Sequence, residues 1–238
     1  LESHDVPANV KIIDLSQDYR DESNGFVYGL PEVNRERIKK ATKLANPGCF
    51  ATAIQIGLLP LAAAGLLKNE IHTNGITGST GAGVKPGATS HFSWRNNNIS
   101  IYKAFTHQHL IEIGMTIRNL QPSFDKDINF LPVRGDFSRG IYVSQYTECD
   151  LDEEAAIKLY KDFYKDSAFT FVMDKNPDLK QVVNTNKGIV HVEKHGNKLL
   201  IISMIDNLLK GASGQAVQNF NLMFGLDEKM GLNLKSVA

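Results

Sequence analysis

Cys49 is the residue of this sequence best placed for nucleophilic chemistry. It follows Asn46-Pro47-Gly48 at the start of a predicted helix, where Pro47 suits the first helical turn. Unpaired N–H groups and the helix dipole favour an anion at such a position, so the pattern predicts a lowered thiol pKa and a reactive thiolate. A small buried hydrophobic residue is the alternative for an isolated cysteine. The sharp turn favours the nucleophile, whereas Cys149 has no such context and is predicted to be structural.

His107 and His109 are candidates for acid–base catalysis beside such a nucleophile. His109 and Glu112 lie on one face of a predicted helix, so the carboxylate could orient the ring and hold its tautomer. The alternative is a pair of ordinary surface histidines. No cysteine or carboxylate set at zinc-ligand spacing accompanies them, and we therefore expect no metal site.

Three further parts of the chain could contact a ligand. The glycine-dense turn 78–83 could direct successive backbone N–H groups at a phosphate, but it matches neither Walker A nor GxGxxG and could equally be a flexible loop. Arg134 and Arg139, each followed by a glycine, could pair with a substrate anion or be ordinary surface charge. The run 206–215 contains small residues, which allow close approach of a ligand or backbone or cap the last helix.

The elements that would position these residues follow from the spacing of apolar side chains. Helices are predicted from 46–49 onward, over 109–120, from about 153 to 165 and over roughly 213–224, and strands over 10–15, around 71, and over 129–133, 140–146, 188–193 and 199–205. The segment 18–34 is predicted to be a loop. The residues His195-Gly196-Asn197-Lys198 are a strong hairpin signal between the last two strands.

This order of elements predicts an α+β middle region with an antiparallel or mixed sheet. The first ~45 and last ~30 residues do not obviously belong to it and could pack together as part of another α/β unit. In the final helix, Ala216, Val217, Phe220 and Phe224 are predicted to face inward, and Gly225 is predicted to cap the C-terminus.

Composition excludes several classes of protein. Lys and Arg number 26 and Asp and Glu number 26, so the chain is neutral and we expect no nucleic-acid partner. Residues 44–67 carry no charge but contain Pro, Gly and polar side chains, which predicts a buried helix and no membrane partner. Two cysteines are too few for a disulfide scaffold. With no secretory leader visible, we expect free thiols and a cytoplasmic protein.

Several motifs, taken in order along the chain, are similar to those of N-acetyl-gamma-glutamyl-phosphate reductases, a family related to aspartate-semialdehyde dehydrogenase. They are Asp14-Leu15-Ser16-Gln17-Asp18-Tyr19-Arg20, Tyr28-Gly29-Leu30-Pro31-Glu32, Asn46-Pro47-Gly48-Cys49, the turn 78–83, His107-Gln108-His109 with Glu112, and the run 206–218. The resemblance implies an α/β plus α+β fold. It comprises a remnant of a Rossmann-type NADP-binding domain over 1–45, a glyceraldehyde-3-phosphate-dehydrogenase-like catalytic and dimerisation domain with a mixed sheet over 46–206, and a C-terminal helix over 207–238 that returns to the first domain.

The resemblance also implies a reaction, the NADPH-dependent reduction of an N-acyl-glutamyl phosphate to its semialdehyde in arginine biosynthesis. Cys49 would form the thioester and His109 would be the acid–base catalyst. The other implied roles are support of catalysis by His107 and Glu112, NADP binding by Ser79, Gly81, Ala82, Gly83 and Asn207, and substrate binding by Asn46 and Arg134. The family commonly forms homo-oligomers, which we expect here. Ile111 stands where the family usually has proline.

One departure from the family pattern bears on the cofactor. No glycine-rich pyrophosphate fingerprint precedes Val10, so we expect the chain to lack the first part of the cofactor domain, to bind NADP poorly and to turn over little. The apolar face formed by Val217, Phe220 and Phe224 should then be exposed or covered by a neighbouring molecule. Two other classes of function compete with the reductase, namely a cysteine-dependent acyltransferase or hydrolase, which needs no nicotinamide, and a non-catalytic binding module.

Overall fold

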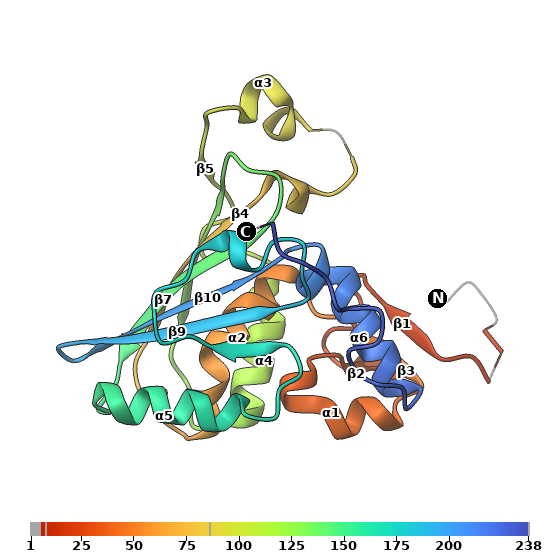
Figure 1. Ribbon diagram of the computed structural model, residues 1–238, viewed down its shortest axis with the longest axis horizontal. Coiled ribbons are helices and arrows are strands. Elements are labelled where there is room, and N and C mark those ends of the chain that lie inside the picture. Colours follow the sequence, from red (N-terminus) through yellow and green to blue (C-terminus); the bar gives the residue numbers. More distant parts are fainter. Residues whose placement is uncertain (1–5, 8, 86, 238) are drawn as a thin grey trace.

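Two β-sheets of unequal size organise the chain (Figure 1). The computed structural model describes residues 6–7, 9–85 and 87–237; residues 1–5 and 8 of the predicted 1–45 unit, residue 86 of the predicted 46–206 unit and residue 238 of the predicted 207–238 unit lie outside these ranges. The large sheet has the strand order β5 (Ser100–Ile101), β6 (Ile128–Arg134), β4 (Ile71–Thr77), β7 (Ile141–Glu148), β10 (Lys198–Ile205), β9 (Gly188–His195) and β8 (Thr170–Val172). The pairs β4/β6 and β8/β9 are parallel and the others antiparallel, so the predicted mixed sheet is confirmed.

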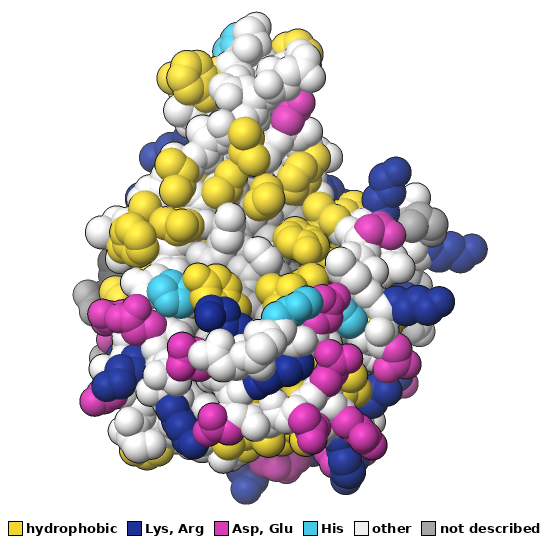
Figure 2. Space-filling model, turned by 90° about the vertical axis from the view of Figure 1, so that its left-hand side faces the viewer, with side chains coloured by type: hydrophobic (Ala, Val, Ile, Leu, Met, Phe, Trp, Pro, Cys, Tyr) yellow, Lys and Arg dark blue, Asp and Glu magenta, His cyan; other side chains and the backbone are white. Residues whose placement is uncertain are grey.

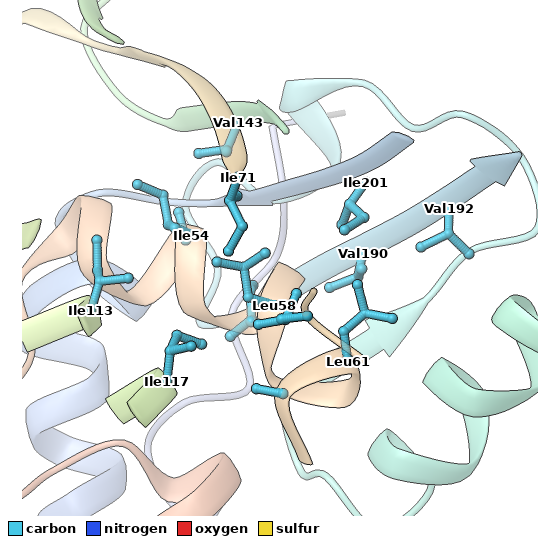
Figure 3. Packing of buried hydrophobic residues seen from close by; sticks show 14 of the residues in the cluster. Ile54, Leu58, Leu61, Ile71, Ile113, Ile117, Val143, Val190, Val192 and Ile201 are labelled. Atoms are coloured by element: carbon cyan, nitrogen blue, oxygen red, sulfur yellow. The ribbon is translucent and has the colours of Figure 1, made fainter. Parts of the chain in front are cut away.

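Helices α2 (Cys49–Ala63), α4 (His109–Leu120) and α5 (Glu153–Tyr164) cover one face of the large sheet (Figure 1). The side chains of α2 are buried on every side, because the helix runs between the sheet and α4. Figure 3 shows Leu58 of α2 packed among Ile117 of α4 and Val190 and Ile201 of the sheet. The uncharged segment is therefore an interior helix of the core. Within the described ranges, no helix is long and apolar enough to cross a membrane.

The small sheet is parallel throughout, in the order β1 (Ile12–Asp14), β3 (Lys43–Ala45) and β2 (Val27–Tyr28). Helix α1 (Pro31–Lys40) follows β2 and packs beside α6 (Gly214–Met223), which is remote in sequence (Figure 1). The predicted loop over 18–34 is wrong, since it contains β2 and the beginning of α1. Helix α1 gives a weak signal because it is mostly charged and buries few apolar side chains.

Helix α6 turns a polar side inward, and the predicted inward orientation of Val217, Phe220 and Phe224 is wrong. These three side chains are 40%, 44% and 50% exposed. Its buried side consists mainly of amide side chains, with Leu222 and Met223 in a small apolar cluster at its end. Gln215 donates a hydrogen bond to Thr52 Oγ1, and Asn219 donates to the Gly29 carbonyl. The separate expectation of an exposed apolar face on this helix is confirmed.

In the described part of the chain, no α-helix covers the opposite face of the large sheet, although the turn that contains Leu179 and Val182 packs on one part of it. This face carries a cavity of 560 Å³, lined by residues that include Phe105, Leu131, Tyr146 and Leu200. An arm formed by residues 87–101, with α3 (Phe92–Arg95) at its tip, projects beyond this sheet (Figure 1). Figure 2 shows hydrophobic side chains gathered at the base of the arm, above a belt of charged residues.

Candidate active site

Cys49 is the first residue of α2, with Gly48 as the N-cap, so Pro47 precedes the helix and does not lie in its first turn as predicted. The His109 ring lies directly against Gly48, because a Cβ atom at position 48 would be 2.3 Å from His109 Nε2. On another side, a Cβ at Gly211 would be 2.8 Å from the Cys49 Cβ. The nucleophile candidate therefore sits between the beginning of α4 and the π-helical turn Leu209–Ser213, which we call the π-turn.

The predicted lowering of the Cys49 pKa is wrong. Burial raises the pKa of the Cys49 thiol to about 11, and the nearby Glu112 carboxylate acts in the same direction. The backbone N–H of Phe50 and the charge of Arg20 lower it, as expected for a helix N-terminus. The contribution of the helix is therefore present, but the loss of hydration outweighs it. The resting side chain is a neutral thiol.

His109 is also neutral at rest. Burial, with the charges of His107, Arg20 and Lys103, holds its pKa well below the usual histidine value. Its Nδ1 is buried and has no hydrogen-bond partner among the described residues. A neutral imidazole has one ring nitrogen that can accept a proton, so His109 is equipped as a general base.

His107 supports His109 structurally. Its Nδ1 accepts a hydrogen bond from the His109 backbone N–H, and the two rings are 4.6 Å apart. Phe50, Phe130 and Tyr102 surround the ring edge-on. Burial in this aromatic cage lowers the pKa of His107 to about 4. Its nitrogen serves the start of α4, which makes His109 the better candidate for proton transfer.

The buried His107 should make the fold sensitive to acid. Its pKa is about 4 when folded and 6.5 without burial. The unfolded chain therefore binds a proton first as the pH falls below 6.5, and stability is lost down to pH 4. The difference between the two pKa values corresponds to about 3 kcal/mol in the free energy of unfolding. We expect His107→Asn to lose that much less stability between these pH values, as measured by urea unfolding. Identical pH dependence in the two proteins would contradict the assignment.

Glu112 contacts the Cys49 turn more closely than it contacts His109. Its Oε2 accepts hydrogen bonds from the Tyr28 hydroxyl at 2.6 Å and from the Gly48 backbone N–H at 3.1 Å. Its Oε1 is 3.0 Å from Arg20 Nη1 but 3.9 Å from His109 Nε2, which is beyond hydrogen-bond distance. The predicted orientation of the ring by a Glu112 hydrogen bond is therefore absent from this arrangement.

Arg20 and Tyr28 are site residues that the analysis of chemical motifs missed. Both belong to segments that carry the family resemblance, but they are 92 and 84 positions from Glu112. Spacing within one helix or strand could not connect them. Arg20, His109 and Glu112 also line a cavity of 330 Å³, together with the loop 17–21.

The turn 78–83 does not present the predicted row of free N–H groups. The backbone N–H groups of Gly78, Ser79 and Thr80 donate to the carbonyls of Gly140, Phe137 and Ser138, and those of Gly81 and Gly83 bond within the turn. The prediction that successive backbone N–H groups of this turn point at a phosphate is therefore wrong. Asn207 is buried and braces the turn, since its Oδ1 accepts from the Gly140 N–H and its Nδ2 donates to Thr80 Oγ1.

The two residues expected to bind substrate have different surroundings. Asn46 is 1% exposed, and its amide joins the Ala212 carbonyl to Asn219, so it belongs to the framework behind the site. Arg134 ends β6 opposite Thr77 of β4, and its guanidinium lies 4.7 Å from the centre of the Tyr102 ring. No carboxylate in the described part of the chain pairs with it. Arg139, by contrast, pairs with the buried Asp206 at 2.9 Å.

Comparison with known proteins places this site in a family. Residues 49–207 match the family model described as the semialdehyde dehydrogenase dimerisation domain. Proteins named N-acetyl-gamma-glutamyl-phosphate reductase from Azobacteroides pseudotrichonymphae, Parabacteroides distasonis and Bacteroides thetaiotaomicron are 66%, 63% and 60% identical to the chain. Each match covers 100% of this chain and 74% of the relative.

Solved structures agree on the fold. Aspartate semialdehyde dehydrogenase II from Vibrio cholerae matches with a TM-score of 0.68 at 17% identity, covering 90% of this chain and 72% of that chain. A probable aspartate-semialdehyde dehydrogenase from Pseudomonas aeruginosa matches with the same score at 15% identity. The protein thus has an aspartate semialdehyde dehydrogenase-like fold. The family-model match agrees with this fold, and the named relatives are similar to the chain over its whole length. The protein therefore belongs to the N-acetyl-gamma-glutamyl-phosphate reductase family.

Proposed function

We propose that the protein reduces an N-acyl-L-glutamyl 5-phosphate to the corresponding semialdehyde, with release of phosphate, through a thioester on Cys49. The observation that carries this assignment is the half-buried thiol at the N-terminus of α2, next to a neutral imidazole that lies on Gly48. An acyltransferase or hydrolase would use the same pair. It is not favoured, because the relatives are reductases.

The two neutral groups define how the reaction begins. As Cys49 Sγ attacks the acyl phosphate carbonyl, His109 accepts the thiol proton at Nε2, the nitrogen that lies against Gly48. The bond from sulfur to carbon forms, the bond from carbon to the phosphate oxygen breaks, and phosphate leaves. Backbone N–H groups in the first turn of α2 stabilise negative charge on the carbonyl oxygen. His109 is then an imidazolium that can return its proton.

The reductive half of the reaction needs a nicotinamide cofactor, and we assign NADP. When bound, it supplies hydride to the thioester carbon. Asn207 fits such a group: its bonds to Gly140 and Thr80 leave one N–H and one oxygen lone pair, which a carboxamide can use. The exposed side of the turn that includes Ser79, Gly81, Ala82 and Gly83 would border the cofactor. His109 donates its proton as the sulfur leaves the reduced carbon.

The domain organisation supports this arrangement. We assign residues 1–45 and 207–238 to part of a Rossmann-type cofactor domain and residues 46–206 to the catalytic domain. The small sheet is parallel, and ligands of such sheets bind beyond the carboxyl ends of the strands. Strand β3 ends at Ala45 and leads directly into the turn that presents Cys49. Helix α6 packs against α1 of the same unit.

Arg134 is the residue we assign to the substrate phosphate. It sits at the carboxyl end of β6, beside the end of β4 where the turn 78–83 begins. The Tyr102 ring lies under the guanidinium, with its centre 4.7 Å away. Burial raises the pKa of Tyr102, and the charges of Arg134 and Cys49 act on it in opposite directions. A guanidinium without a carboxylate partner is suited to a phosphate.

The first half-reaction offers a direct test. Mixed with N-acetyl-glutamyl phosphate and no cofactor, the protein should release up to one phosphate per chain and gain the mass of the acyl group on Cys49. Addition of NADPH in large excess should then convert the thioester to the semialdehyde, slowly because we expect this chain to bind NADP poorly. Continued phosphate release by hydrolysis without NADPH would favour the hydrolase. An absence of both release and mass gain would exclude a thioester mechanism.

We assign the open face of the large sheet to association of two copies of the chain. The matched family model is named for dimerisation, and Tyr146 on this face is 41% exposed. Tyr146→Glu should weaken the dimer by about 30-fold, because an interfacial tyrosine contributes about 2 kcal/mol. Analytical sedimentation measures the dissociation constant of the dimer for Tyr146→Glu and for Val217→Glu. The second variant is the control, because Val217 on α6 is equally exposed (40%). Equal dissociation constants for the two variants would contradict this interface.

A further inference from the structure

Arg20 connects three segments around the Cys49 turn. From the loop after β1, its Nε donates a hydrogen bond to the Asn46 carbonyl at 3.0 Å and its Nη2 donates to the Leu15 carbonyl at 3.2 Å. Its Nη1 makes the ion pair with Glu112 at 3.0 Å, with side chains only 13% and 4% exposed. Nη1 also touches Gly48, since a Cβ there would be 2.7 Å away. All three nitrogens of the guanidinium are thus directed at the framework of the site.

The position of Arg20 decides which group Glu112 can pair with. Glu112 Oε2 is occupied by Tyr28 and by the Gly48 N–H. Its Oε1 therefore remains for either Arg20 or His109. Arg20 holds it at 3.0 Å, whereas His109 Nε2 is 3.9 Å away. A buried carboxylate without a hydrogen-bonded cation would attract the imidazole or take up a proton itself.

The electrostatics of the pair agree with this geometry. Burial raises the pKa of Glu112, and Arg20 is the strongest influence in the opposite direction. Burial lowers the pKa of His109, and His107, Arg20 and Lys103 lower it further. Arg20 thus favours the charged form of Glu112 and the neutral form of His109. The other charged or titratable groups around the His109 ring are Lys103, His107 and Glu112, the thiol of Cys49 next to Gly48, and Asp18 and Asp21, which line the same cavity.

We propose that Arg20 is a positioning residue of the reductase reaction: it keeps Glu112 on the Cys49 turn and away from His109, so that the imidazole is free to take the thiol proton. The inference rests on the proposed function, in which His109 is the base. Arg20 does not touch the reacting atoms in this role. It acts through Glu112.

The test follows proton uptake by His109 and Glu112, using the imidazole proton and carboxyl carbon resonances of the protein. In Arg20→Met, we expect the pair to take up a proton at a pH higher by about one unit or more. The acidic limb of kcat/KM should move upward by the same amount, and kcat should fall by about 100-fold, because the base is then paired or misplaced. Arg20→Lys should retain the wild-type titration, since it keeps the charge.

Matched variants separate this role from a purely structural one. Arg20→Met combined with Glu112→Gln removes the carboxylate as well, so the His109 titration should return most of the way to its wild-type position, with only the direct effect of the Arg20 charge remaining. Arg37→Met removes another arginine of this region, paired with Glu22 at 2.9 Å, and should not move it. Where Arg20→Met does not fold, Arg20→Gln replaces it. The glutamine amide keeps a hydrogen-bond donor that supports folding, but it removes the positive charge, so the same upward shift of the titration is expected.

The possible outcomes are distinct. A titration that stays at the wild-type position in both Arg20→Met and Arg20→Gln would overturn the proposal, even if thermal stability fell. A shift that persists at full size in the double variant would also overturn it, since the effect would not pass through Glu112. Failure of the wild-type protein to release phosphate from N-acetyl-glutamyl phosphate would instead contradict the proposed function, and the resonances would still report on Arg20.

Discussion

Cys49→Ser should lower the rate of semialdehyde formation by about 10⁴-fold or more, comparable with the loss of the nucleophile in other covalent enzymes. A serine hydroxyl is a weaker nucleophile than a thiol and much harder to deprotonate. The neutral His109 that accepts a thiol proton would not generate an alkoxide at an equivalent rate. Both the phosphate release without cofactor and the oxidation of NADPH should be lost together, because both follow from attack by this atom.

Cys149→Ser is the matched control for this change. Cys149 is buried in the core of the large sheet and lies away from the π-turn and α4 contacts that define the site. It should retain phosphate release and full turnover. Retention of more than about a tenth of the wild-type rate by Cys49→Ser would sink the thioester mechanism, since no other thiol of the two in the sequence could replace it.

Lys210→Met should destabilise the fold by about 3–5 kcal/mol. Lys210 Nζ is 2.8 Å from Glu32 Oε1, and the two side chains are 0% and 1% exposed. Burial alone would raise the pKa of Glu32, but the charge of Lys210 holds it below its usual value. Removal of the lysine would leave a buried carboxylate without a cation, bonded by the Thr170 hydroxyl and a backbone N–H. Urea unfolding measures the difference.

Two variants make the Lys210 prediction specific. Replacing both partners, in Lys210→Met with Glu32→Leu, should recover most of the lost stability, because no unpaired charge remains. Lys158→Met removes an exposed ion pair with Asp162 and should change stability by less than about 0.5 kcal/mol. A loss below about 1 kcal/mol in Lys210→Met, similar to that of the surface pair, would contradict the role of the buried pair.

The elements that the sequence predicted well have signals in adjacent residues. The hairpin of β9 and β10 pairs His195 with Lys198 around Gly196 and Asn197, as the turn motif predicted, and Gly196 has a φ of 58°. Asp152 caps α5 by accepting a hydrogen bond from the Ala155 N–H. In both cases, the residues of the turn or cap are sufficient to determine the local structure.

The features that sequence analysis missed depend on contacts between distant residues. The pKa of Cys49 is set by burial among elements far apart in the chain, so the helix N-terminus predicted the wrong direction. The link from Arg20 to Glu112 spans 92 positions. Asn46 looked available to a substrate because nothing near it in sequence shows that α6 and the π-turn cover it. Local patterns do not encode these long-range neighbours.

The high pKa of Cys49 has a consequence for the survival of the resting enzyme. Peroxide and electrophiles react with thiolates, and a pKa of about 11 leaves about one thiolate in 10⁴ molecules near neutral pH. Between turnovers, the sulfur is therefore shielded from conversion to sulfenic acid. The arrangement delays activation of the thiol until an acyl phosphate is in place, so protection from oxidative damage and readiness for catalysis do not conflict.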